Sequence, residues 1–141
     1  MKTKAVIVAL ALGLTLATGA HAARSAVPLV EPARVALIAG GAKASDEAVK
    51  NAIIAGGAER GWTVVSSEPG KLRLKFNKHD KHEVVVDALY DATGYQLKYV
   101  DSKNMKYENG ANGPMIHPFY NRWLEYLMGS IAKNQVKTAA Q

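Results

Sequence analysis

The stretch that decides the fold is residues 62–101, WTVVSSEPGKLRLKFNKHDKHEVVVDALYDATGYQLKYVD. Within it, Leu72, Leu74 and Phe76 alternate with polar side chains, which is the two-residue period of a strand with one buried face. Turn residues separate this segment from three other apolar segments. We therefore expect four strands, over residues 62–67, 71–77, 83–90 and 95–101. Because the connections are short, consecutive strands should pair antiparallel.

A helix is expected on each side of the four strands. Ser45 is a good N-cap, because its hydroxyl accepts from a free backbone N–H of the first turn, and the first helix is expected over residues 45–60. The glycine pair at 56–57 either frays this helix or lets its backbone approach the sheet closely. The second helix begins at Pro118, a favoured residue at the first helical position. Its apolar stripe consists of Phe119, Tyr120, Trp123, Leu124, Leu127, Met128 and Ile131.

This order of elements predicts a two-layer α+β domain: helix, four-stranded antiparallel meander, helix, with both helices on one face of the sheet. The opposite face of the sheet mixes charged and apolar side chains. They are Arg73, Lys75, Asp87, Gln96 and Lys98, with Val65, Val85, Leu89 and Val100. This mixture is more apolar than a plain solvent face, so either the N-terminal segment covers it or it is a contact surface.

The first 22 residues have the three parts of a secretory signal peptide. Lys2 and Lys4 form a basic start, residues 5–17 are apolar, and Ala20 and Ala22 are the small residues that a signal peptidase reads. The apolar run is too short for a bilayer, which needs ~20 residues. We expect cleavage after Ala22, export to the periplasm and no stable membrane insertion of the mature chain. The alternative is an uncleaved membrane anchor.

Changes in composition divide the rest of the chain into a linker, a folded domain and a tail. Residues 23–44 are predicted as a linker, in which residues 34–39 form a possible edge strand. Residues 45–134 form the α+β domain. A polar loop over residues 102–116 interrupts this domain, and it is long enough to be functional or pinned by specific contacts. Residues 135–141 are predicted as a disordered tail.

Charge and cysteine content narrow the classes of function. The chain has 18 Lys and Arg against 12 Asp and Glu, a net charge of +6, which becomes +4 (16 against 12) when Lys2 and Lys4 leave with the signal peptide. This mild charge favours solubility and loose attraction to anionic surfaces such as lipid headgroups. With no cysteine, disulfides and thiolate metal sites are excluded. Export and modest charge argue against nucleic-acid binding, and the sequence predicts no cofactor.

Several motifs together carry a resemblance to a group of known proteins. They are Gly61-Trp62, Pro69-Gly70, Tyr99-Val-Asp101-Ser102-x-Asn104 and Ile116-His117-Pro118-x-Tyr120-Asn121-x-Trp123, of which the last is the most specific. This pattern resembles small exported proteins and lipoproteins of Gram-negative bacteria, most of them without an assigned function. The resemblance covers approximately residues 45–132, and it implies a fold and an envelope location but no reaction. Many members carry a lipobox cysteine that this chain lacks, so the resemblance does not imply lipid tethering here.

The pair His79 and His82 is the first candidate for metal binding. Imidazoles close in sequence can share an ion, and Asp80 lies between these two in a predicted turn. No third ligand is evident, so the alternative is a solvated hairpin tip.

His117 suggests a second candidate, hydrolysis. A carboxylate can orient a histidine that activates a hydroxyl, and His117 lies near Asp101 and Ser102 if the loop folds back. However, Asp101 and Ser102 are neighbours in a strand, so their side chains start on opposite sides, which is poor geometry for a relay. No Gly-x-Ser-x-Gly elbow supports it either.

The remaining possibility is a binding surface formed by the long loop and the start of the second helix. Its candidate residues are Asp101, Ser102, Asn104, Tyr107, His117, Tyr120, Asn121 and Arg122. The alternative is that the Asp, Asn and His side chains among them hydrogen-bond backbone groups and pin the loop to the helix. The sequence thus predicts a non-catalytic binding or interaction module of the cell envelope, with an envelope protein or a small ligand as partner. The competing hypothesis is a small metal-binding protein or hydrolase.

Overall fold

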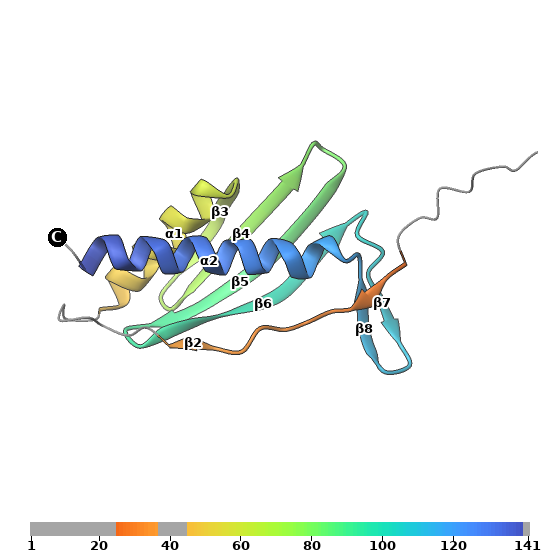
Figure 1. The fold of residues 1–141 in the computed structure, drawn as a ribbon, viewed down its shortest axis with the longest axis horizontal. Coiled ribbons are helices and arrows are strands. Elements are labelled where there is room, and N and C mark those ends of the chain that lie inside the picture. The colour runs from red at the N-terminus through yellow and green to blue at the C-terminus, as the bar shows by residue number, and fades with distance from the viewer. Residues whose placement is uncertain (1–24, 37–44, 140–141) are drawn as a thin grey trace, which may run out of the picture.

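The structure is a computed structural model that describes residues 25–36 and 45–139 (Figure 1). The predicted signal peptide and the residues after Ala36 in the possible edge strand lie outside the described residues. Along the chain the elements are β1 (Val27–Pro28), β2 (Val35–Ala36), α1 (Asp46–Glu59), β3 (Trp62–Glu68), β4 (Lys71–Lys78), β5 (His82–Asp91), β6 (Gly94–Lys103), β7 (Glu108–Gly110), β8 (Gly113–Ile116) and α2 (Phe119–Ala139).

The larger sheet has the antiparallel strand order β2-β6-β5-β4-β3. Leu74 lies opposite Val86, and Val86 lies opposite Tyr99, so these side chains share one face. Figure 1 shows α1 and α2 lying across one face of this sheet. The predicted α+β class is confirmed. The sheet has five strands rather than four, because Val35 and Ala36 pair with Tyr95 and Gly94 and add an edge strand.

The prediction of one loop over residues 102–116 is wrong. β6 continues to Lys103, and β7 and β8 form an antiparallel hairpin in which Glu108 lies opposite Met115. β1 joins this hairpin through Val27 and Ile116, which gives a second sheet of order β1-β8-β7. These strands could not be recognised in the sequence, because Glu108–Gly110 and Gly113–Ile116 are short and lack the alternation of apolar and polar side chains.

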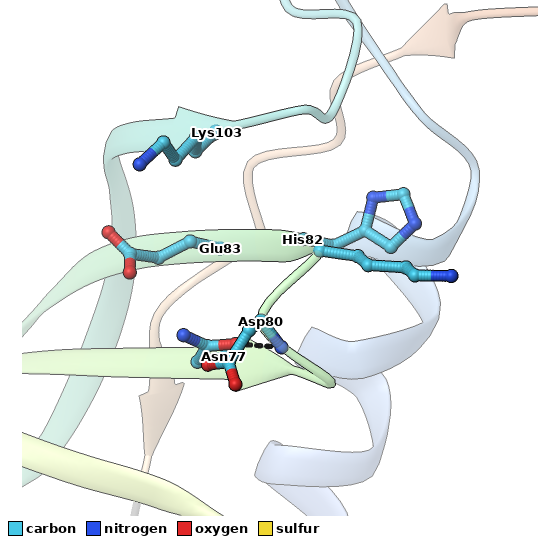
Figure 2. Close-up of a pocket in the computed structure, with 6 residues that line it drawn as sticks. Asn77, Asp80, His82, Glu83 and Lys103 are labelled. Carbon is cyan, nitrogen blue, oxygen red and sulfur yellow. Dashed lines mark hydrogen bonds between the residues drawn. The ribbon is translucent and has the colours of Figure 1, made fainter.

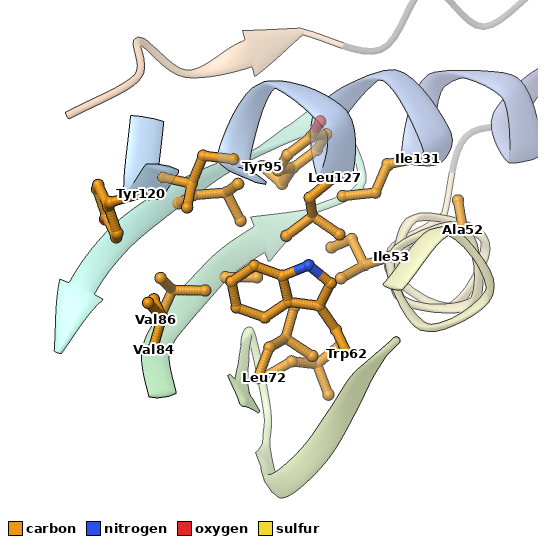
Figure 3. Packing of buried hydrophobic residues seen from close by; sticks show 14 of the residues in the cluster. Ala52, Ile53, Trp62, Leu72, Val84, Val86, Tyr95, Tyr120, Leu127 and Ile131 are labelled. Carbon is orange, nitrogen blue, oxygen red and sulfur yellow. The ribbon is translucent and has the colours of Figure 1, made fainter. Parts of the chain in front are cut away.

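The core lies between the larger sheet and the two helices. It consists of Val49, Ala52, Ile53, Trp62, Leu72, Leu74, Val84, Val86, Ala88, Tyr95, Leu97, Met105, Ile116, Tyr120, Leu124, Leu127 and Ile131. In Figure 3, Trp62 lies beneath Leu127 and Ile53, where α1, α2 and the sheet meet. Burying each large side chain of this kind stabilises the fold by ~1.5–3 kcal/mol before the cost of ordering it.

The two helices touch through a glycine. A Cβ added at Gly56 would lie 2.6 Å from the backbone nitrogen and 2.7 Å from the Cα of Ile131. The expectation of close approach is therefore correct, but the partner is α2 and not the sheet. Beside this contact, the buried Ser130 hydroxyl donates to Glu59 Oε2 at 2.9 Å, which also ties α2 to α1.

The helix ends follow local sequence. The Ser45 hydroxyl accepts from the backbone N–H of Ala48 at 3.1 Å, which confirms the predicted N-cap. α2 continues to Ala139 and so extends into the region 135–141 that the sequence analysis assigned to a tail. Neither helix of the described segments is long and apolar enough to cross a membrane.

The face of the sheet opposite the helices carries paired charges. Arg73 donates to both carboxylate oxygens of Asp87, at 2.8 and 3.0 Å, and this hydrogen bonding lowers the pKa of Asp87 against the opposing effect of burial. Two further pairs are Lys75–Glu83 and Lys71–Glu68. Lys71, Arg73 and Lys75 of β4 are thus each matched by an acid, which lowers the net charge of this face.

Replacing Gly56 with Ala should destabilise the protein. The new methyl group would meet backbone atoms of Ile131, which cannot rotate away, so α1 and α2 must separate. We expect a loss of ~1–3 kcal/mol in the free energy of unfolding, as for other overpacked contacts, measured by urea denaturation. The matched control is Gly129→Ala on α2, where nothing lies within 4 Å of an added Cβ and alanine should raise stability by up to ~1 kcal/mol. Equal effects at the two glycines would contradict this packing.

Candidate functional site

We call residues 25–36 the strap. Figure 1 shows it running from β1 on the smaller sheet to β2 on the larger one. At one end Val27 and Pro28 pair with β8, and the Leu29 N–H donates to the Pro114 carbonyl at 2.9 Å. At the other end β2 pairs with β6. The strap therefore joins the two sheets, and part of the predicted linker is structured.

Asn121 on α2 holds the middle of the strap by both ends of its side-chain amide. Its Oδ1 accepts from the Val30 N–H at 3.0 Å, and its Nδ2 donates to the Pro28 carbonyl at 3.0 Å. These are the two hydrogen bonds that a neighbouring strand would supply, so Asn121 takes the place of a strand residue. Residues 28–30 thus have hydrogen-bond partners on both sides, one from β8 and one from α2.

Two side chains of β6 hold the next part of the strap. Gln96 donates to the Pro32 carbonyl at 3.2 Å, and the Lys98 ammonium pairs with the Glu31 carboxylate. Both Gln96 and Lys98 were predicted on the face opposite the helices. The N-terminal segment therefore contacts this face along β6, while Val65 and Leu89 on β3 and β5 are 50% and 38% exposed.

Asn104 fastens the end of β6 to the hairpin between β4 and β5. Its backbone is in the left-handed region, with φ of 55°, a conformation that Asn tolerates better than most residues. Its side-chain amide donates to the Lys81 carbonyl at 2.9 Å, and its own carbonyl lies 2.8 Å from His82 Nδ1. Because a carbonyl can only accept, His82 carries its proton on Nδ1 in this bond.

His117 is a buried residue at the start of α2, and it is 9% exposed. Its backbone N–H donates to the Met105 carbonyl at 2.7 Å, and its Nδ1 accepts from the Phe119 N–H at 3.2 Å. The second bond satisfies one of the free amides of the helix N-terminus. Since Nδ1 accepts, the neutral ring carries its proton on Nε2, and that nitrogen has no lone pair to offer a metal.

The structure brings His117 next to His82, a pairing that the sequence analysis did not consider. The two ring centroids are 5.9 Å apart. Figure 2 shows the His82 ring turned away from Glu83 and Lys103, which line an open pocket together with Asn77, Asp80, Lys81 and His82 itself. Among the described residues, no group of three or more His, Cys, Asp and Glu side chains could hold a metal ion.

Asp101 and Ser102 follow a bulge in β6. Val85 lies opposite Asp101 but Val86 lies opposite Tyr99, so Val100 is the extra residue. Asp101 is exposed, and its Oδ1 accepts from the Ser102 N–H at 2.8 Å. The Ser102 hydroxyl instead pairs with the Tyr99 hydroxyl at 2.9 Å. These partners use Asp101 and Ser102 to shape the strand end, and they are not the partners that a His–Asp–Ser relay requires.

Three tyrosines form a cluster between β6, β7 and α2. Tyr99 stacks on Tyr107 with centroids 4.5 Å apart and an interplanar angle of 11°, and it meets Tyr120 edge-on at 5.7 Å. Tyr120 is fully buried, and its burial raises the pKa of its hydroxyl. Tyr107 is 41% exposed. The cluster therefore has a buried base and one exposed ring.

The eight predicted binding residues thus have different environments. Asp101, Asn104, His117 and Asn121 bond backbone groups, as the pinning alternative describes. Ser102 bonds Tyr99, and Tyr120 is part of the core. Asp101, Tyr107 and Arg122 are exposed. Tyr99 and His82 also belong to this region and were not expected there, because only their contacts with residues far away in the sequence reveal them.

No protein-family model, no curated protein and no solved structure matches this chain.

Proposed function

We propose that this protein is an exported, periplasmic binding or interaction module of the cell envelope, without catalytic activity. The signal-peptide pattern of residues 1–22 supports export. The resemblance of the Ile116–Trp123 block and its neighbours to small exported Gram-negative proteins supports an envelope location. The partner is an envelope protein or a small ligand.

The observation that carries the proposal is how the polar residues beside the tyrosine cluster are used. Asn121, Asn104 and His117 bind main-chain groups, and Ser102 binds a tyrosine. Residues engaged in this way hold the strap and the strand end in place. A catalytic centre needs groups directed at a substrate, so this arrangement favours a rigid surface over a reaction site.

Tyr107 is the residue of this surface that we assign to partner contact. Its ring stacks on Tyr99, and Tyr99 is fixed in turn by Ser102 and Tyr120. An exposed aromatic ring that is already immobilised loses little conformational entropy on binding. Tyrosine is also among the residue types that dominate binding energy at protein interfaces.

The competing hypothesis of a metal site or hydrolase has less support. His82 and His117 are close, but His117 directs its unprotonated nitrogen at the Phe119 amide. Asp101 and Ser102 are engaged with local groups. The pair of His82 and His117 therefore lacks the oriented ligands that metal-binding or relay chemistry uses.

Tyr107→Ala tests the proposed contact residue. Truncating an immobilised aromatic at an interface should weaken capture of the partner by 10-fold or more, on the order of 1.4 kcal/mol or greater. The measurement is capture of envelope proteins from a bacterial extract by immobilised wild type and variant, followed by titration of the recovered partner. The control is Tyr126→Ala, which removes another exposed tyrosine on α2 and should leave capture unchanged. Equal capture by wild type and Tyr107→Ala would remove this surface from consideration.

Divalent ions should leave the melting temperature unchanged. A ligand that binds only the native state must raise stability, by ~2.7 kcal/mol at 100 times its Kd. We expect no shift with Zn²⁺, Cu²⁺, Ni²⁺ or Mn²⁺, and the same null result for a His82→Ala control. A rise in wild type that disappears in the His82→Ala variant would establish the metal-binding alternative.

A further inference from the structure

One flank of α2 carries three aromatic rings that are not fully buried. Phe119, Trp123 and Tyr126 follow each other at spacings of four and three residues, so they form a row along one side of the helix. Phe119 and Trp123 are half-buried and Tyr126 is 50% exposed. We call these three residues the aromatic flank.

The aromatic flank continues into the rim of the larger sheet. The Phe119 and Trp123 centroids are 5.7 Å apart, and Trp123 meets Phe76 of β4 edge-on at 4.9 Å. Phe76 is half-buried and contacts Trp62, which is buried. Ring contacts therefore connect Phe119 and Trp123 to Phe76 and, through it, to the buried Trp62.

Core packing explains only part of this row. The side of α2 that packs on the sheet is Leu124, Leu127 and Ile131, each 1% exposed or less. The second half of α2 packs against α1, where Gly56 contacts Ile131 and Glu59 accepts a hydrogen bond from Ser130. The first half of the same flank, from Phe119 to Tyr126, extends beyond these contacts with α1.

Cationic side chains border the aromatic flank. The Arg60 guanidinium lies 5.6 Å from the Tyr126 ring centroid, in position for a cation–π contact. Arg122 is exposed and lies one helical turn from both Phe119 and Tyr126. The nearest acids by position are Glu125, on the far side of Arg122, and Glu59, which Ser130 and Lys133 engage. Arg60, Arg122 and Lys133 against Glu59 and Glu125 leave the border with one net positive charge.

We propose that the aromatic flank and its arginines are a contact site for the surface of an anionic lipid bilayer. Tryptophan and tyrosine favour the membrane–water interface, because one part of each ring is apolar and the other polar. Arginine and lysine near such a surface are attracted to anionic headgroups. The contact is peripheral and reversible, and it extends the proposed function: it requires an envelope location but not the Tyr107 surface.

An acidic protein partner is the principal alternative for the same residues. The row favours a lipid surface because its rings are arranged in a line along a helix flank, with cations on the border, as in interfacial helices. It also places the aromatic ring most suited to an interface, Trp123, between two others. An acidic protein that occupies the flank while vesicles do not would overturn the proposal.

The direct test uses tryptophan emission of the mature protein with lipid vesicles. The chain has two tryptophans, and Trp62 is only 4% exposed, so Trp123 should report contact with lipid. Vesicles with phosphatidylglycerol should shift the emission to the blue and pellet the protein, and both effects should weaken as salt rises from 0.05 to about 0.5 M. Vesicles of phosphatidylcholine alone should do neither. Equal binding to both compositions, or no shift with either, would overturn the proposal.

Variants locate the contact. Arg60→Gln should weaken partitioning to anionic vesicles about five-fold, which corresponds to ~1 kcal/mol per cation. Tyr126→Ser should weaken it several-fold, with circular dichroism unchanged because both side chains are exposed. The matched control is Lys50→Gln on the first half of α1. Tyr107→Ala should bind vesicles normally, which separates this proposal from the protein-partner surface. Binding that Arg60→Gln and Tyr126→Ser leave unchanged would overturn the assigned site.

Discussion

The burial of one side of α2 against the sheet is the interaction on which the rest of the structure depends. Leu124, Leu127 and Ile131 fill the space above the apolar face that Leu72, Leu74 and Val86 present. This contact fixes the rotation of the helix. It therefore also decides where the remaining sides of α2 point: Asn121 toward the strap, Ser130 toward α1, and Trp123 of the aromatic flank toward Phe76 of β4. One hydrophobic contact positions three groups of polar or aromatic residues.

The polar residues that most resemble a functional site have a structural role: they hold neighbouring segments of the chain together by hydrogen bonds. The strap has only two residues in each of its strands, too few to hold it by pairing alone. The Asn121 amide, the Lys98–Glu31 pair and the Gln96 hydrogen bond supply what the short strands lack. At the end of β6, hydrogen bonds from Asn104 and His82 join this strand to the β4–β5 hairpin. Groups that are already engaged in this way have less capacity for chemistry, and the exposed rings beside them become the candidates for recognition.

Much of the fold could be predicted from the sequence, because it depends on local periodicity. The alternation in residues 71–77, the Ser45 cap and the stripe of α2 each specify an element within a short window. β7 and β8 could not be predicted, since they are short and lack an alternating pattern, and β1 pairs with β8 from about 90 residues away. Asn121 was singled out, but its role depends on Val30 and Pro28, and nothing in local spacing indicates that contact. Phe119 and Trp123 were expected in the core stripe and do pack against the core, but they stay partly exposed, and periodicity alone does not show how far the cover of a stripe extends.

The central claim, that Asn121 holds the strap against the body of the protein, is tested most directly by hydrogen exchange of the Val30 amide. This N–H has Asn121 Oδ1 as its partner, whereas the Leu29 amide is bonded to Pro114. We predict that both amides are protected in the wild type, and that in Asn121→Ala the Val30 amide exchanges at the rate of an unprotected amide. In that variant, amides of β4 and β5 should keep their protection. A Val30 amide that exchanges freely in the wild type, or that stays protected in Asn121→Ala, would contradict the account.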